Sequence, residues 1–337
     1  MDFTTPMVSR RQILAGVGLS AAALLAACGG GAGAQDSPSK AAARMDLSVA
    51  FVTLTAVNAP IWLAEASGAF TAHGLNVKSQ YIESNVATKA LIAKEIDLIL
   101  QAGAPIITAN LNGNAGLVML ASSLNHSQHA MVTPADIRTP ADFKGKVLGA
   151  DRPGTTNDYQ NRVLLKLMGL QPTDVTMRVL SGGSNTLLPA LTTGQIQGAA
   201  LSPPEVFQAE AAGLHILQDS YSEPYQGGAW VAPRDRIDEL ASRIPPFLSA
   251  FHQGMVVYRQ QPDLAKRTLQ ERTKTTDQTL LDKSYDFFLK TAPFQDDLQP
   301  TIEGIQRMLD YLADTVPAAK GANPRQFLDL RFLPVAP

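Results

Sequence analysis

Residues 47–82 read LSVAFVTLTAVNAPIWLAEASGAFTAHGLNVKSQYI and contain a complete strand–helix–strand unit. The β-rich run 47–53 predicts a strand, and the run 75–82 predicts the next one. Between them, Pro60 fits the first turn of a helix that continues through Phe70, because proline lacks the N–H that this turn leaves unpaired. This order of elements predicts an α/β fold with a mainly parallel sheet.

The same alternation continues along the chain. A first unit extends to about residue 121, a second restarts near Thr139, and a helical region closes the chain. Two α/β units followed by a helical tail favour two lobes over one large sheet. Further strands are predicted at 96–100, 117–121, 147–150, 175–179, 198–201 and 228–232, and further helices at 87–94, after 103–105, and at 158–168, 182–193, 264–273, 280–291 and 300–312.

Composition narrows the class of protein. The 337 residues allow about two domains. The 28 Lys and Arg nearly balance the 30 Asp and Glu, so no charge-driven nucleic-acid surface is expected. A hydrophobic fraction of 45% is that of a globular protein. The single cysteine excludes an internal disulfide and a cysteine-clustered zinc site.

The N-terminal segment 1–27 predicts an export signal. Arg10 and Arg11 precede the Gly/Ala/Leu run 15–27, which resembles a twin-arginine signal, although a general export signal can also carry two arginines. The run is too short to span a bilayer comfortably, since about 20 apolar residues are needed.

The single cysteine, Cys28, follows Leu25-Ala26-Ala27, a sequence that resembles the lipobox of bacterial lipoproteins. The resemblance implies cleavage before Cys28 and lipid attachment to it, with the protein held at a membrane on the periplasmic side. The alternative is a chance cysteine at the end of an ordinary signal peptide. Residues 28–44 contain Gly, Ala, Ser, Pro and Lys and predict a flexible tether.

Several short motifs occur in a characteristic order. They are Ala59-Pro60, 68–70 with 74–77, 90–97 before Gly103, 143–147 with 154–156, 187–194, and Ser202-Pro203-Pro204-Glu205. Their order and spacing resemble the substrate-binding proteins of ABC importers, in the group that binds nitrate, taurine, alkanesulfonates and thiamine precursors. The chain departs from that pattern at Gln197, where many relatives carry an acidic residue, and in the form of the 202–205 turn.

The resemblance implies a two-lobed type II periplasmic-binding-protein-like fold, with a hinge, a ligand cleft between the lobes and a helical C-terminal region. Residues 46–130 with 230–337 would form lobe 1, and residues 131–229 lobe 2. The implied partners are a small-molecule ligand, an ABC permease and its ATPase. The protein is expected to act as a monomer, without a cofactor or bound metal, and to be no enzyme.

Ligands of open α/β sheets bind outside the carboxyl ends of the strands. The turns at such positions are rich in Gly, Thr, Ser and Asn, which offer close backbone approach and hydrogen-bonding groups. Trp230 and Tyr225 could stack on a ligand, although burial in the core is the alternative for both. The predicted ligand-binding residues are Thr53, Thr55, Asn58, Gly103, Ala104, Gly154, Thr155, Thr156, Asn157, Gly183, Ser184, Asn185, Ser202, Glu205 and Trp230.

The turns 154–157 and 182–185 each precede a helix, and converging helix N-termini favour an anion. Alternatively, Asn157 and Asn185 simply cap these helices. Few cationic residues lie in the turns. A ligand balanced by N–H dipoles or an uncharged aromatic heterocycle is therefore favoured over a strongly charged one.

His126 and His129 are spaced i, i+3, but two histidines are too few for a zinc site, so a surface or hinge position is expected for them. An exported enzyme on the same fold, acting on a pyrimidine precursor or an ester, is the competing function. The chain lacks a Gly-x-Ser-x-Gly elbow, a His-Glu-x-x-His motif and a Gly-Lys-Ser/Thr phosphate loop. A ligand sensor for a signalling partner is a third alternative.

Overall fold

The computed structural model describes residues 43–334. The export signal with Arg10 and Arg11, the lipobox with Cys28 and nearly all of the tether lie outside the described residues. The described residues 43–334 belong to a single compact unit that contains two five-stranded sheets. No helix among residues 43–334 is both long enough and apolar enough to cross a bilayer.

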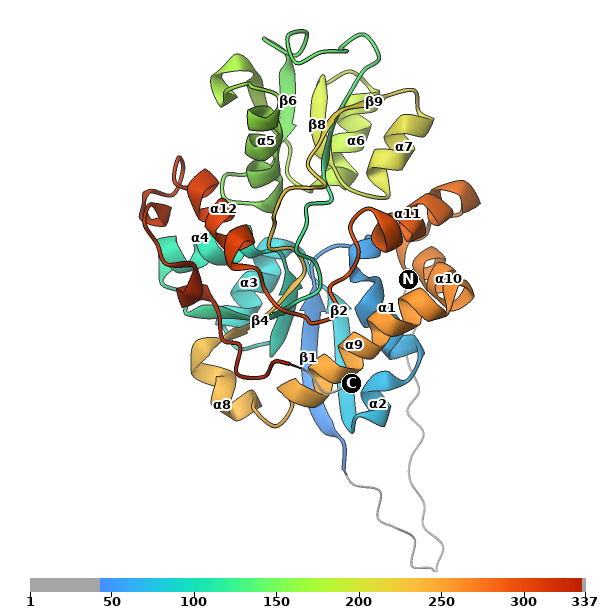
Figure 1. The fold of residues 1–337 in the computed structure, drawn as a ribbon, viewed down its shortest axis with the longest axis vertical. Coiled ribbons are helices and arrows are strands. Elements are labelled where there is room, and N and C mark those ends of the chain that lie inside the picture. Colours follow the sequence, from blue (N-terminus) through green and yellow to red (C-terminus); the bar gives the residue numbers. More distant parts are fainter. Residues whose placement is uncertain (1–42, 335–337) are drawn as a thin grey trace, which may run out of the picture. The chain divides into compact units, whose positions relative to one another are not determined.

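The first sheet has the strand order β2-β1-β3-β10-β4 (Figure 1). Strand β1 pairs in parallel with β2 and β3, whereas β10 runs antiparallel between β3 and β4. The strands are β1 (Met45–Phe51), β2 (Leu75–Tyr81), β3 (Leu98–Gln101), β4 (Leu117–Ser122) and β10 (Ala229–Pro233).

The second sheet has the strand order β7-β6-β8-β5-β9. Strand β6 pairs in parallel with β7 and β8, and β5 runs antiparallel between β8 and β9. Both sheets are therefore mixed: four of the five strands in each run in one direction, as the prediction of a mainly parallel sheet implies, and β10 or β5 runs in the opposite direction. The strands are β5 (Ala130–Thr133), β6 (Val147–Ala150), β7 (Thr176–Val179), β8 (Gly198–Leu201) and β9 (His215–Asp219).

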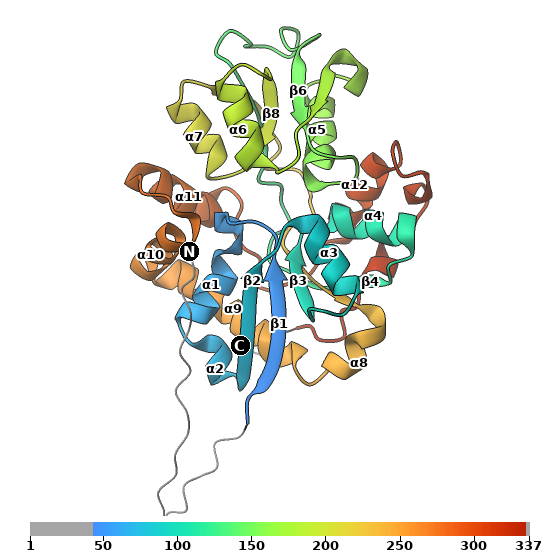
Figure 2. The ribbon, with the colours of Figure 1, turned by 180° about the vertical axis from the view of Figure 1, so that it is seen from behind.

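Strand alternation gives the first sheet two buried faces. Leu98 and Leu100 of β3 point to one face and Ile99 to the other, so each side carries its own hydrophobic cluster. Figures 1 and 2 show helices α1, α2 and α9 on one side and α3, α4 and α12 on the other. These helices are α1 (Ala59–Ala66), α2 (Ala69–Ala72), α3 (Ser84–Ile92), α4 (Gly103–Gly113), α9 (Ile244–Gln260) and α12 (Ile302–Leu312).

The second sheet is covered in the same way. Ala199 and Leu201 of β8 pack with α6 and α7, whereas Ala200 faces the cluster that includes residues of α5. The helices are α5 (Thr156–Leu167), α6 (Ser184–Thr192) and α7 (Glu205–Ala211); the C-terminal region adds α8 (Ile237–Leu240), α10 (Pro262–Thr273) and α11 (Gln278–Lys290). The helical C-terminal region is thus confirmed.

The helix predicted from Pro60 through Phe70 is interrupted. It ends at Ala66, and Gly68 adopts a left-handed conformation with φ of 75° before α2 begins. A residue with a side chain rarely adopts this conformation, so the glycine separates the two helices.

Two connections link the sheets, one between β4 and β5 and one between β9 and β10. They run side by side and are joined by backbone hydrogen bonds, including Ser127 N to Glu223 O (3.2 Å) and Tyr225 N to Asn125 O (3.0 Å). Between the two connections, the hydroxyl oxygens of Ser127 and Ser220 lie 2.7 Å apart.

The boundaries of two lobes within the chain remain a prediction.

Helices α1 and α9 are in contact through Gly254. A Cβ atom at this position would lie 2.0 Å from Pro60 O and 2.9 Å from Ala64 N. Gly254→Ala is therefore expected to force the helices apart and to lower the free energy of unfolding by about 2 kcal/mol, despite the better helix propensity of alanine. Denaturant titration measures the change.

Gly113→Ala is the matched control for this substitution. Gly113 also lies in a helix, and a Cβ there meets no atom within 4 Å, so this variant should be as stable as the parent or up to about 1 kcal/mol more stable. Equal stabilities of the two variants would contradict close packing at Gly254.

Candidate functional site

A cavity of about 210 Å³ is lined by residues from both sheets and from the connections between them. An engineered cavity of about 150 Å³ in another protein holds benzene, so this space fits a solute of one ring or slightly more. Every parallel strand contributes the turn that follows its carboxyl end, as expected for open α/β sheets. From the first sheet these turns follow β1, β2 and β3, and from the second they follow β6, β7 and β8.

On the first-sheet side, hydrogen bonds fix the turn after β1. Asn58 Nδ2 donates to Thr53 O at 2.7 Å and to Thr53 Oγ1 at 2.8 Å, while the hydroxyls of Thr53 and Thr55 lie 3.1 Å apart. After β2 and β3, Gln101 Nε2 donates to Ser84 Oγ at 2.7 Å. These bonds hold polar groups at the cavity wall.

On the second-sheet side, Asn157 holds the turn after β6. Its Oδ1 accepts from Asp151 N at 2.9 Å, and its Nδ2 donates to Ala200 O at 3.2 Å. The N-cap of α5 is Thr155, whose Oγ1 accepts from Asp158 N, and that of α6 is Gly183. The alternative that Asn157 and Asn185 cap these helices is therefore wrong.

The connections between the sheets supply the most deeply buried part of the cavity wall. His129 and Tyr225 line the cavity and are 7% and 2% exposed. The Tyr225 ring stacks on Tyr159 with centroids 5.6 Å apart, and His129 meets its edge. Burial lowers the pKa of His129 to about 4, so the imidazole is neutral at pH 7.

Unpaired polar atoms gather at this wall. His129 Nδ1, Tyr225 Oη and Gln128 Oε1 are buried and have no hydrogen-bond partner within residues 43–334. Buried polar groups are nearly always paired, so unpaired ones require an explanation. The side chains that carry them line the cavity, but the three atoms themselves have almost no accessible surface.

The cavity wall carries negative charge. Glu83 and Asp151 line it, one after β2 and the other after β6, and none of the lining residues in the described chain is Lys or Arg. Arg152 lies beside one of them, with its Nε 3.9 Å from Asp151 Oδ1, but its side chain is 55% exposed. An exposed pair of this kind offsets little of the charge.

Most of the residues predicted for ligand binding meet at this cavity. They are Thr53, Thr55, Asn58, Thr155, Thr156, Asn157, Gly183, Ser184 and Ser202. Tyr225, for which stacking and core burial were both open, is buried and also lines the cavity.

Other predicted residues lie outside the cavity lining. Gly154 packs on α4, where Thr108 Oγ1 donates to Gly154 O at 3.4 Å. Gly103 packs against Gln226 and Met308, and Ala104 is buried in the core. Asn185 is exposed. Glu205 is buried at the start of α7.

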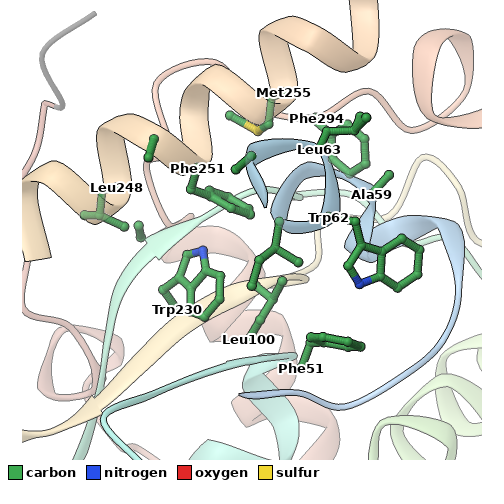
Figure 3. Close-up of a cluster of buried hydrophobic side chains, with 14 of the residues drawn as sticks. Phe51, Ala59, Trp62, Leu63, Leu100, Trp230, Leu248, Phe251, Met255 and Phe294 are labelled. Carbon is green, nitrogen blue, oxygen red and sulfur yellow. The ribbon is translucent and has the colours of Figure 1, made fainter. Parts of the chain in front are cut away.

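Trp230 also lies outside the cavity, so the structure does not support its predicted contact with ligand. Strand alternation turns its side chain to the face of the first sheet that α9 covers. There it packs edge-on against Phe247 and Phe251, with ring centroids 4.6 and 5.3 Å away. Figure 3 shows Trp230 and Phe251 side by side. Trp230 is thus fully buried in the core, as is Trp62.

Sequence reasoning missed several lining residues. Tyr81 is the last residue of β2, Glu83, Ser84 and Asn85 follow that strand, and Asp151 follows β6. A position at or just after a strand end could therefore have identified them. His129 and Gln128 lie on a connection whose course depends on the packing of both sheets. Among the described residues, no three of His, Cys, Asp and Glu gather into a metal-binding group.

Glu205 provides a pH-dependent readout of stability. Burial raises its pKa from 4.5 to about 7, so the folded protein binds more protons than the unfolded chain between these values. The stability that this carboxyl contributes is present below pH 4.5 and is lost as the pH rises through 7.

We therefore expect wild type to lose about 2 kcal/mol of unfolding free energy relative to Glu205→Gln between pH 5 and pH 7. Denaturant titrations of both proteins at the two pH values measure this difference. Taking the difference removes the opposite contribution of His129, whose lowered pKa makes stability rise with pH over part of the same range. A pH-independent difference would contradict the raised pKa.

Solved structures with the same architecture include periplasmic binding proteins. The periplasmic aliphatic sulphonate binding protein SsuA of Escherichia coli superposes with a TM-score of 0.70 at 17% identity, covering 84% of this chain and 92% of that one. The alkanesulfonate-binding protein SsuA of Xanthomonas axonopodis pv. citri gives 0.68 at 19% identity, covering 87% and 98%. The periplasmic nitrate-binding protein NrtA of Synechocystis PCC 6803 gives 0.63 at 13% identity, covering 81% of each.

These identities establish a shared fold, that of the periplasmic binding proteins, as predicted. None of the curated proteins compared with the chain matches it in sequence. A family description does match: the sequence model of the family NMT1/THI5 like covers residues 55–265, which include β2 to β10 and most of the cavity wall. By this match over more than half of its length, the chain belongs to the NMT1/THI5 like family.

Proposed function

We propose that this protein is the solute-binding component of an ABC importer, which captures a small organic solute in its cavity and delivers it to a membrane permease and its ATPase. The observation that carries this proposal is the cavity wall, which is built from the strand ends of two sheets joined by two connections. Closure of two lobes about a hinge is how periplasmic binding proteins respond to ligands. The fold neighbours, which are named for binding sulfonates and nitrate, support the same role.

We further propose that the protein is exported, acts as a monomer and is anchored through lipid on Cys28. The lipobox sequence at residues 25–28 supports the anchor. Cell fractionation tests it, because wild type should sediment with membranes and Cys28→Ser should not. Release of wild type and variant alike would contradict the anchor.

An enzyme on this fold is the alternative, and the cavity gives it little support. With a pKa of about 4, the His129 imidazole is a weak general base at pH 7. Its Nδ1 is also unpaired within the described chain, so it forms no nucleophile–base pair through this atom. Ser184 Oγ instead accepts from Ser202 N at 3.4 Å.

A thermal-shift panel with analysis of the compounds afterwards tests the proposed function. Sulfonates, nitrate, carboxylates, aromatic acids, pyrimidines and amidines are each incubated with the full chain. A compound at one hundred times its dissociation constant should add about 2.7 kcal/mol of stability. Stabilisation by a compound that mass spectrometry recovers unchanged supports a binding protein, whereas conversion of the compound would establish an enzyme.

A further inference from the structure

The charges on the cavity wall bear on the kind of solute that it accepts. Each side of the cavity contributes one carboxylate, Glu83 after β2 and Asp151 after β6. His129 is neutral at pH 7 and adds no positive charge. Bringing an oxyanion into this space would place like charges together without a lining cation to offset them, and the cost is larger beside Asp151, which is partly buried, than beside Glu83, which is exposed.

Helix N-termini do not reverse this balance. Glu83 itself occupies the N-cap position of α3. At α5, the Thr155 hydroxyl accepts from Asp158 N, and the Asp158 carboxylate accepts from Gly154 N at 3.0 Å. Helices α1 and α6, whose N-caps Asn58 and Gly183 also line the cavity, begin without a side-chain cap, and each helix end is equivalent to about half a positive charge, against two full carboxylate charges.

The buried part of the cavity wall includes hydrogen-bond acceptors that have no partner in the described chain. Gln128 Oε1 is a carbonyl oxygen that can only accept, and a neutral imidazole such as that of His129 has one accepting nitrogen. His129 and Tyr225 line the cavity and are both more than nine-tenths buried, and their unpaired atoms lie behind its surface. The ring of Tyr225 adds an aromatic surface beside them.

We propose that the cavity selects a small, neutral or positively charged solute that carries N–H donor groups on or beside a flat ring, and that it rejects oxyanions such as sulfonates, nitrate and carboxylates. Amidines, guanidines, amines and amides have the required donors. Glu83 and Asp151 determine the specificity, because a donor group held between them contacts both sides of the cavity. This inference rests on the proposed binding function and adds the chemical class of the solute.

A series of probes with one shape and different charges tests the proposal. Benzamidine is a cation, benzamide is neutral, and benzoate and benzenesulfonate are anions, while the ring is common to all four. Calorimetric titration of the full chain at pH 7 should give benzamidine the highest affinity, at least about tenfold above either anion. The affinity for benzamidine should fall as salt is added, since salt screens charge.

The double substitution Glu83→Gln with Asp151→Asn removes the two charges without changing the shape of the side chains. It should weaken benzamidine binding by about tenfold or more and bring the affinities for benzamidine and benzamide together. The matched control is Glu95→Gln with Asp136→Asn, since both carboxylates are exposed and neither lines the cavity. The control should bind like wild type.

The outcomes separate this inference from the proposed function. Tighter binding of benzoate or benzenesulfonate, an unchanged double variant, or no binding of benzamidine or benzamide would each overturn the charge selection. If an anion binds tightly and is recovered unchanged, the selection is wrong and the binding role stands. Should benzamidine be preferred while a compound of the panel is converted, the selection stands and the binding role is wrong.

Discussion

Trp230→Ala is expected to lower the free energy of unfolding by about 4 kcal/mol, because it removes a large side chain from a packed core. Trp230 is fully buried, and the rings of Phe247 and Phe251 lie against it from α9. A cavity in this place cannot be filled without moving α9, which Gly254 holds against α1. Denaturant titration followed by circular dichroism measures the loss.

Ligand affinity provides the second readout for Trp230→Ala. Trp230 does not line the cavity, so at a temperature where the variant is folded, the affinity for the best compound of the panel should stay within about threefold of wild type. Trp230→Phe should cost less stability, since it keeps an aromatic ring in the core. A small stability loss with a large affinity loss would show that Trp230 contacts the ligand.

Ser184→Trp is expected to weaken ligand binding by about one hundredfold or more, because an indole side chain would take up most of a cavity of this size. Ser184 lines the cavity at the first turn of α6 and is only partly buried, so the larger side chain can extend into the cavity without entering the core. Calorimetric titration with the best compound of the panel measures the effect. The melting temperature should change little.

Asn185→Trp is the control for Ser184→Trp. Asn185 is the next residue along α6, but it is exposed and does not line the cavity. The same change in size should therefore leave affinity within about threefold of wild type. Equal loss in both variants would place Asn185 at the ligand, as the sequence predicted, and would contradict the geometry of α6 described above.

Much of the fold could be predicted because its signals are local. The strand at 47–53, the helix start at Pro60 and the strand at 75–82 follow from residue types and spacing within a few turns. Strands β5 and β9 were missed, although other strands of 4 residues were predicted, because no strand–turn–helix alternation marks these two segments. Their antiparallel pairing depends on contacts with strands that are far away in sequence.

The candidate site could be predicted only in part. Their positions in turns after parallel strands predicted Thr53, Asn58, Thr155 and Ser184 correctly as cavity-lining residues, because the carboxyl ends of such strands meet at one edge of a sheet. The same rule also gave Gly154, although the contact with Thr108 turns it away from the cavity. Which residues of a turn face the cavity depends on packing between elements, and the spacing of residues along the chain does not reveal this packing.

By itself, the sequence determined the α/β class, the family resemblance and the turns that contribute to a site, because strand periodicity, helix starts and glycine turns act over a few residues. The tertiary structure alone decided that Trp230 faces α9, that His129 is buried and neutral, and that Glu83 and Asp151 line one cavity. Burial of a side chain, and the placement of two carboxylates from different sheets at one cavity, arise only when distant segments pack together. No short stretch of the sequence therefore reveals the features on which the proposed selectivity rests.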